Sequence, residues 1–459
     1  MIDLPADCPL PVDGFPADFI WGAATSAYQI EGAPTADGAG LSIWDVFAAT
    51  PGNIADGTDG RVACDHYHRY REDVALLKAL SVGAYRFSIA WTRVLPAGVG
   101  AVNSAGLDFY DRLVDELLAA GIQPYATLYH WDLPWELETR GGWLNPDIAS
   151  WFAEYAAATA DRLGDRVRHW FTLNEPWVVS DPGHLRGVLA PGRHDLGSAR
   201  AAANNLIRAH GSSLAALRSC GDFEVGLAVN LTPQHPATES AADREAAALN
   251  HAYINAQFLD PLLRGEHPPE MPRVYGATWQ PLSADDLTAA SAPIDFIGVN
   301  YYLREIVTAD PSAGPFPWRT GPTPGAATTA MGWEIYPAGL REILLWLRER
   351  YGDRPLLITE NGAAFDDPPP EGRSLVDRPR IDYLHAHLTA AQAAIAAGVD
   401  LRGYFLWSLL DNFEWQCGYA KRFGIVHVDL PTGERTPKAS AAWYGRQIET
   451  ARGRSIAPQ

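Results

Sequence analysis

The sequence is poor in cysteine and has no long apolar run. Its four cysteines among 459 residues, Cys8, Cys64, Cys220 and Cys417, are scattered and form no Cys-x-x-Cys pair. This excludes a disulfide-dense scaffold and a cysteine-based zinc site. We expect reduced thiols, although an even number leaves disulfides open. No run approaches the roughly 20 apolar residues that a membrane-spanning helix needs.

Positive charge is also scarce. Lysine and arginine together number 36, of which only three are lysine, against 55 acidic residues, and the net charge is −19. Such an acidic surplus argues against binding to nucleic acid or to an anionic membrane. The N-terminus has no basic region followed by an apolar one, as a signal peptide would. We therefore expect a cytoplasmic protein with neither kind of partner, and the sequence predicts no particular oligomeric state.

Strand-like runs alternate with helical patterns along the whole chain. Alternation of this kind implies parallel strand pairing. Eight such units close into a (β/α)8 TIM barrel, an α/β fold with long βα loops over its active-site face. An open doubly wound sheet is the alternative, and no linker divides the chain, so we expect one domain over residues 1–459. The predicted strands are 19–24, 84–91, 122–130, 168–174, 224–230, 295–302, 355–360 and 402–409. The predicted helices are 65–80, 104–120, 146–163, 199–218, 243–263, 337–351, 379–397 and 438–451.

One segment, residues 304–331, is rich in proline and glycine and has little periodicity. Loops of this length inside a compact domain are usually functional or disordered. Because the segment follows the sixth predicted strand, we expect it to overhang the catalytic face of a barrel.

Two short segments carry the chemistry. Residues 172–176 (TLNEP) and 358–362 (ITENG) each place a glutamate, Glu175 or Glu360, at the end of an apolar, β-branched run. In a barrel the carboxyl ends of the strands meet at one rim. Two carboxylates on either side of a glycosidic bond are the minimum equipment for glycoside hydrolysis.

Hydrogen-bonding side chains and tryptophans gather at the other predicted strand ends. A sugar site needs donors and acceptors for hydroxyl groups and an aromatic plane for the pyranose face. Singly, His130 is more often a core histidine, Arg86 a structural ion-pair partner and Trp407 a core residue. Together they favour a sugar site. The residues at strand ends are Gln29, Arg86, His130, Trp131, Asn174, Asn300, Tyr302, Trp407, Glu414 and Trp415.

On these motifs the chain resembles glycoside hydrolase family 1, the β-glucosidase family, over nearly its whole length. Besides the two glutamate motifs, the segments that carry the resemblance are 15–32, 64–70 (CDHYHRY), 85–91 (YRFSIAW), 129–134 (YHWDLP), 407–415 (WSLLDNFEW) and 435–438 (RTPK).

The resemblance implies hydrolysis of β-glycosides with retention of configuration. It implies that Glu175 is the acid/base and Glu360 the nucleophile, with Arg86 and Tyr302 beside the nucleophile. It implies a β-glucoside or cello-oligosaccharide substrate, with β-fucosides and β-galactosides slower or comparable, and no metal or organic cofactor. The substrate-binding positions that it implies are Gln29, His130, Trp131, Asn174, Asn300, Trp407, Glu414 and Trp415, with Trp333 at the aglycone entrance.

These roles predict opposite protonation states for the two glutamates. Arg86 and Tyr302 should favour an ionised Glu360. A water-poor site and the charge of Glu360 should raise the pKa of Glu175 and keep it protonated at neutral pH.

Two other functions compete. A 6-phospho-β-glycosidase of the same family usually carries a serine where Glu414 stands, and Glu414 would repel a phosphate that Phe423 cannot bind. A non-catalytic glycoside-binding barrel, or a thioglucosidase, typically lacks one of the two glutamates. The chain also departs from the family pattern after Glu175, so the sequence does not predict which leaving group is preferred. The departing residues are Val178, Val179, Asp181 and His184.

Overall fold

A computed structural model of the protein describes residues 4, 7–370, 372 and 375–453. The prediction of a cytoplasmic protein rests in part on the N-terminal residues. Of these, residues 1–3 and 5–6 lie outside the described residues. No helix in the described part of the chain is long and apolar enough to cross a membrane. All four cysteines are free thiols, as expected.

Eight parallel strands close into a barrel. The first strand pairs with the last barrel strand on one side and with the second on the other, which rules out the open sheet. Strands β2, β7 and β10 are buried at every position, because the helices cover the outside of the barrel as in other parallel sheets. The order around the barrel is β1 (Ile20–Ala24), β11 (Leu401–Trp407), β10 (Leu356–Asn361), β7 (Phe296–Asn300), β5 (Glu224–Asn230), β4 (His169–Asn174), β3 (Gln123–Tyr129) and β2 (Ala84–Ser88).

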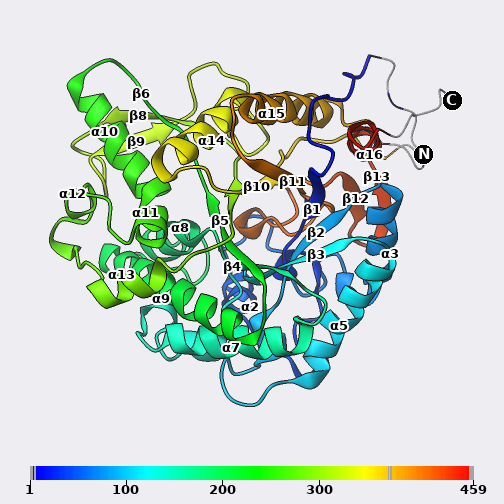
Figure 1. The fold of residues 1–459 in the computed structure, drawn as a ribbon, viewed down its shortest axis with the longest axis horizontal. Coiled ribbons are helices and arrows are strands. Elements are labelled where there is room, and N and C mark those ends of the chain that lie inside the picture. Colours follow the sequence, from blue (N-terminus) through cyan, green and yellow to red (C-terminus); the bar gives the residue numbers. More distant parts are fainter. Residues whose placement is uncertain (1–3, 5–6, 371, 373–374, 454–459) are drawn as a thin grey trace.

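Helices surround the barrel in a ring (Figure 1). Seven of the predicted helices are confirmed to within three residues at each end. They are α3 (His66–Ala79), α5 (Ser104–Ala119), α7 (Ile148–Leu163), α9 (Leu196–Cys220), α14 (Pro337–Tyr351), α15 (Arg378–Ala396) and α16 (Ala439–Ala451).

The predicted helix 243–263 is not one regular helix. It consists of α10 (Ala241–His251), a π-helical turn (Ala252–Ala256) and α11 (Gln257–Arg264). Pro261 lies inside α11 and lacks the N–H group that a regular helix requires. The π-helical turn matters for the site, because it brings Ile254 to the active-site cavity.

The second strand ends earlier than predicted. After Ser88 the N–H group of Ala90 bonds to the hydroxyl of Tyr110 at 2.7 Å and leaves the ladder. Trp91 then begins the short helix α4 (Trp91–Val94), and its indole donates to the carbonyl of Gly98 at 3.0 Å. A tertiary hydrogen bond, which a sequence pattern cannot register, therefore ends this strand.

The proline-rich segment 304–331 contains regular structure that we did not predict. Strands β8 (Glu305–Ala309) and β9 (Trp318–Gly321) pair antiparallel, and β8 also pairs with β6 (Gln234–Pro236). Pro311, Pro315 and Pro317 lie in the connection between β8 and β9, where no ladder hydrogen bond is lost. The hairpin packs on its own small core with Tyr253 and Tyr275.

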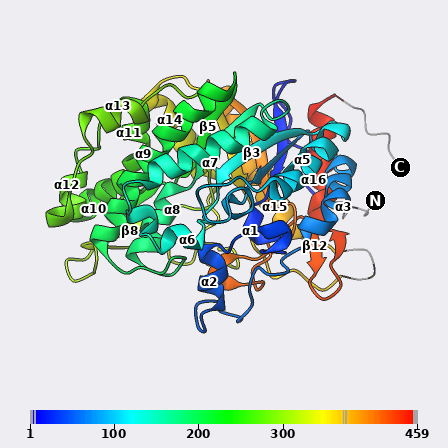
Figure 2. The same ribbon diagram turned by 90° about the horizontal axis from the view of Figure 1, so that it is seen from below.

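The segments that follow the barrel strands gather on one face. In Figure 2 most of them lie in the lower half of the molecule, with α7, α9 and α14 above. They are α1 (Ala27–Ile30), α2 (Ile43–Ala49), α6 (Trp135–Glu138), α8 (Pro176–Ser180), β8 and β12 (Val426–Asp429), which pairs with β13 (Glu434–Pro437). This face carries the predicted catalytic residues, as the barrel architecture requires.

Candidate active site

A cavity of about 300 Å³ opens at the carboxyl ends of the barrel strands. Ten of the thirteen predicted site residues line it: His130, Trp131, Glu175, Asn300, Tyr302, Trp333, Glu360, Trp407, Glu414 and Trp415. The other three, Gln29, Arg86 and Asn174, are buried behind the lining and bond to residues in it. The fold thus brings all thirteen predicted residues together.

Glu360, the last residue but one of β10, is held at both carboxylate oxygens. Arg86 Nη1 donates to Oε1 at 2.6 Å, and the hydroxyl of Tyr302 donates to Oε2 at 2.7 Å. Burial raises the pKa of Glu360, and Arg86 and Tyr302 oppose that effect by stabilising the charged form. The buried carboxylate is therefore oriented by a cation and a phenol.

The chain on the far side of Glu360 is packed very closely. A Cβ atom added to Gly362 would lie 1.7 Å from the carbonyl oxygen of Trp407. Only glycine lets the backbone after β10 pass this close to the backbone at the end of β11. The glycine of the ITENG motif thus sets the position of Glu360 relative to Trp407.

Glu175 follows β4 in a left-handed backbone conformation, with a φ angle of 45°. Its N–H group donates to the carbonyl of Ala228 at 2.8 Å, which fixes this turn. Asn300 Nδ2 donates to Oε1 of Glu175 at 2.8 Å, and Thr359 Oγ1 donates to Oδ1 of Asn300 at 2.6 Å, so the amide orientation is set. Burial and the charge of Glu360 raise the pKa of Glu175 to about 8. The predicted raised pKa is confirmed.

The two carboxylates differ in their partners, and this orders their titration. Glu360 faces an arginine and a phenol, whereas the described hydrogen bond to the Glu175 side chain comes from a neutral amide. In a coupled pair, the group with the cationic partner loses its proton first. Of the two groups, Glu175 therefore keeps its proton to the higher pH.

Asn174, the neighbour of Glu175, is hydrogen-bonded to side chains on or next to three other barrel strands. Asn174 Oδ1 accepts from Arg86 Nη2 at 2.7 Å and from Asn300 Nδ2 at 3.1 Å. Its Nδ2 lies 3.1 Å from His130 Nε2. Burial, with a contribution from Arg86, lowers the pKa of His130 well below its usual value, so the imidazole is neutral. Its Nδ1 atom has no hydrogen-bond partner among the described residues.

Gln29 and Glu414 form the opposite wall. The side-chain N–H group of Gln29 bonds to the carbonyl of Phe413 at 2.9 Å and to Asn412 Oδ1 at 3.1 Å, and lies 3.5 Å from Glu414 Oε2. Ser26 Oγ donates to the Gln29 oxygen at 2.6 Å and fixes the amide. Burial and the charge of Glu360 raise the pKa of Glu414 to about 8.

Aromatic side chains form the floor of the cavity. The Trp407 ring stacks with His130 at 5.8 Å, and Trp131 packs on Trp415 at 4.6 Å. Trp131 has a φ angle of 78° and its indole donates to the carbonyl of Asn174 at 3.0 Å. Trp44, which the sequence did not single out, packs under Trp415 at 4.5 Å. Trp44 lies on α2 (Ile43–Ala49), away from any strand end, so the sequence pattern gave no reason to assign it to the site.

The mouth of the cavity is mostly apolar. Of the positions that depart from the family pattern, Val178 lines it, whereas Val179, Asp181 and His184 are buried behind. Trp333 lines the cavity together with Tyr302, with the two ring centroids 5.4 Å apart. Most of the other lining residues were not predicted, because loop residues with apolar side chains carry no distinctive pattern: Trp177, Val188, Leu189, Leu231, Ile254, Leu303 and Met331.

Among the described residues, no group of three or more histidine, cysteine or acidic side chains has the arrangement of a metal site. The reactive groups that the geometry offers are the two carboxylates. The paired glutamates, the hydroxyl-binding side chains and the aromatic floor match what a glycosidase needs.

Comparison with known proteins agrees with the site. The family model described as Glycosyl hydrolase family 1 matches residues 12–453. The chain belongs to glycosyl hydrolase family 1. Thermostable beta-glucosidase B of Thermobispora bispora is 51% identical over 433 residues, covering 94% of this chain and 89% of that protein. A 1,4-beta-D-glucan glucohydrolase of Thermotoga neapolitana is 48% identical over 441 residues, covering 95% and 98%.

Solved structures of the family superimpose closely. The family 1 β-glucosidase from Thermotoga maritima matches with a TM-score of 0.94 and 48% identity, covering 96% of this chain and 99% of that one. A structure of β-glucosidase from Thermotoga maritima in complex with deoxynojirimycin matches with a TM-score of 0.93. The family predicted from the motifs and its TIM barrel are confirmed, and the chain is a glycoside hydrolase.

Proposed function

We propose that the protein is a retaining β-glucosidase that works by double displacement through a covalent glycosyl-enzyme. The observation that carries the proposal is the pairing of Glu360, held by Arg86 and Tyr302, with the protonated Glu175 in one cavity. The names of the similar proteins, β-glucosidase and glucan glucohydrolase, support the same substrate class.

In the first step, Glu360 attacks the anomeric carbon while Glu175 gives its proton to the glycosidic oxygen. Arg86 and Tyr302 keep the nucleophile ionised and aimed, and they remain as donors when its charge is lost. A proton donor with a pKa of about 8 is protonated at neutral pH, as this step requires.

In the second step, water attacks the glycosyl-enzyme and Glu175 takes its proton. Esterification removes the charge of Glu360, which is one of the causes that raise the pKa of Glu175. The pKa of Glu175 therefore falls between the steps, and the former acid becomes a base. Two inversions at the anomeric carbon give net retention.

We propose an unphosphorylated hexose as glycone. Gln29, His130, Asn174 and Glu414 supply neutral or acidic groups for its hydroxyls, and Trp407 supplies a plane for the ring. β-Glucosides are the expected substrates, with β-fucosides and β-galactosides slower or comparable. A 6-phosphate would meet Glu414 and the apolar Phe423, both of which line the cavity.

We propose that the mouth accepts aryl groups and sugars. Its apolar side chains, among them Val178, Leu189 and Met331, bury an aromatic leaving group, and Trp333 offers a plane to a second sugar. Aryl glucosides and short cello-oligosaccharides are therefore the substrates to assay.

The decisive experiment follows the anomeric configuration of the first product by proton NMR, with an aryl β-glucoside as substrate. The proposal predicts β-glucose first, with slow conversion to the α anomer by mutarotation. Glu360→Gln and Glu175→Gln serve as matched controls, because the first removes the charge of the nucleophile and the second removes the acidic proton, while both keep the size of the side chain. An initial α-glucose product, or a tenfold preference for 6-phosphoglucosides, would refute the proposal.

A further inference from the structure

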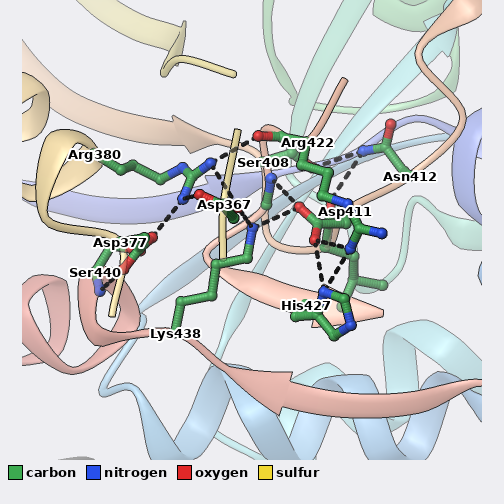
Figure 3. A network of polar contacts seen from close by, with 12 residues as sticks. Asp367, Asp377, Arg380, Ser408, Asp411, Asn412, Arg422, His427, Lys438 and Ser440 are labelled. Carbon is green, nitrogen blue, oxygen red and sulfur yellow. Dashed lines mark hydrogen bonds and ion pairs between the residues drawn. The ribbon is translucent and has the colours of Figure 1, made fainter. Parts of the chain in front are cut away.

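A buried ionic network lies behind the Glu414 wall of the cavity and is not used by the mechanism. Figure 3 shows it between α15, the loop after β11 and the start of α16. Its centre is Lys438, from the RTPK segment, whose side chain is completely buried. Lys438 Nζ donates to Asp367 Oδ2 at 2.5 Å and to Asp411 Oδ1 at 2.7 Å.

Asp411 joins this network to the active-site loop. Its Oδ1 also accepts from the N–H group of Gly424 at 3.0 Å, next to Phe423 of the cavity lining. Three residues further along the chain stands Glu414. One carboxylate thus ties together the two chain segments that form this wall of the cavity.

The next residue, Asn412, carries the connection to the site. Its Nδ2 donates to Ser408 Oγ and to the carbonyl of Leu410, both at 3.1 Å, which locks the loop after Trp407. Its Oδ1 accepts from Gln29 Nε2 at 3.1 Å. A continuous chain of contacts therefore runs from Lys438 through the Asp411–Asn412 pair to Gln29.

At the far end of the network, the described hydrogen bonds of the Asp377 side chain do not reach the 408–415 loop. Asp377 accepts from Arg380 Nη1 at 2.5 Å and from Ser440 Oγ at 2.5 Å. Arg380 Nη1 also bonds to Asp367 at 3.0 Å, and its Nη2 bonds to the carbonyl of Arg422 at 2.7 Å. Asp377 is as buried as Asp411 but serves only α15 and α16.

We propose that Lys438 and Asp411 are positioning residues for the glycone site: their buried ion pair holds the 408–415 loop so that Gln29, Glu414 and Trp415 meet the sugar. The inference rests on the proposed function. A buried ion pair is seldom a net source of stability, since well-packed apolar residues often serve as well. Its use here is geometric, because a fixed charge pair tolerates little displacement of the loop.

The test compares Asp411→Asn with Asp377→Asn, two changes of the same kind in the same network. For each variant the melting temperature, kcat and KM for an aryl β-glucoside, and the inhibition constant of free glucose are measured. For Asp411→Asn we expect KM and the inhibition constant of glucose to rise about tenfold, as when a hydrogen bond to the sugar is lost, with a smaller change in kcat. For Asp377→Asn we expect a lower melting temperature and unchanged kinetic constants.

A second variant covers the case in which Asp411→Asn does not fold. Asn412→Ala changes no charge and removes only the contacts to Gln29, Ser408 and Leu410. It should weaken glucose binding in the same way as Asp411→Asn. Equal kinetic effects of Asp411→Asn and Asp377→Asn, or unchanged glucose binding in Asn412→Ala, would overturn the inference. A wild-type protein without β-glucosidase activity would instead overturn the proposed function and this inference with it.

Discussion

The protonation state of Glu175 should set the alkaline limit of activity. With a pKa of about 8, raised by burial and by the charge of Glu360, Glu175 is protonated in roughly nine of ten molecules at about pH 7 and in one of ten at about pH 9. The acid form carries the first step, so kcat/KM is retained below that pKa and lost above it. The expected loss is about tenfold per pH unit on the alkaline side.

The perturbation is Glu175→Gln, which removes the titrating group but keeps the amide contact with Asn300 possible. We expect kcat/KM for an alkyl β-glucoside to fall by about 10² to 10⁴, the usual contribution of general acid catalysis. The activity that remains should lose the part of its alkaline limb that is due to Glu175. For 2,4-dinitrophenyl β-glucoside, whose leaving group needs no proton, the fall in kcat/KM should be small.

The assay is the initial rate from about pH 5 to about pH 10, with the wild type and the variant and with both substrates. Circular dichroism at each pH controls for unfolding. Glu414 also has a pKa of about 8, so Glu414→Gln is measured in parallel to separate its titration from that of Glu175. An alkaline limb that is unchanged in Glu175→Gln and absent in Glu414→Gln would refute the assignment of the acid. An equal loss on both substrates would refute it as well.

Four further results are expected. Glu360→Gly should abolish hydrolysis of aryl β-glucosides but use α-glucosyl fluoride, since the cavity left by the carboxylate accepts a fluoride that mimics the intermediate; near-normal hydrolysis would contradict this. Glu175→Ala should be rescued by azide on the dinitrophenyl substrate and yield β-glucosyl azide, because azide needs no base, and KM should fall with kcat as the second step becomes limiting. Exhaustive chelation should leave activity unchanged, because the carboxylates supply the proposed chemistry; a loss restored by a divalent metal ion would contradict this. Glu414→Ser should raise the ratio of 6-phosphoglucoside to glucoside hydrolysis, because it replaces a bulky carboxyl group, charged above its pKa of about 8, by a small hydroxyl that can donate to the phosphate; an unchanged ratio would mean that Glu414 does not face that position.

Much of the fold was predictable because its strands are buried on both faces. Runs such as 224–230 and 355–360 are apolar enough to stand out from the helices between them. The β8–β9 hairpin could not be predicted, because prolines and glycines mask its short strands. The early end of β2 depends on Tyr110, which comes from a distant helix.

The site was predictable where the chemistry needs polar residues at strand ends. The two glutamate motifs and His130 carried that signal. The apolar mouth carried none, because residues such as Val188 and Ile254 are placed by loops and by a π-helical turn. The partners of Lys438 were equally hidden, since Asp367 and Asp411 reach it from other parts of the chain.

The pKa of Glu360 also differs from what its two hydrogen-bond partners alone would suggest. Arg86 and Tyr302 favour its charged form as predicted, yet burial outweighs them and raises its pKa. The sequence can identify the partners of a carboxylate. The extent of its burial depends on all the segments that surround the cavity, and the sequence does not show how these pack. The order in which the two glutamates lose their protons nevertheless follows from their hydrogen-bond partners alone.

In the proposed mechanism Glu360 becomes covalently attached to the sugar. The most direct measurement is to incubate the enzyme with 2,4-dinitrophenyl 2-deoxy-2-fluoro-β-glucoside, which forms the intermediate but slows its hydrolysis, and to locate the label by peptide mass spectrometry. We expect one fluoroglucosyl group per molecule, on Glu360, with loss of activity in step with labelling. A label on Glu175 or any other residue, or inactivation without a label, would contradict it.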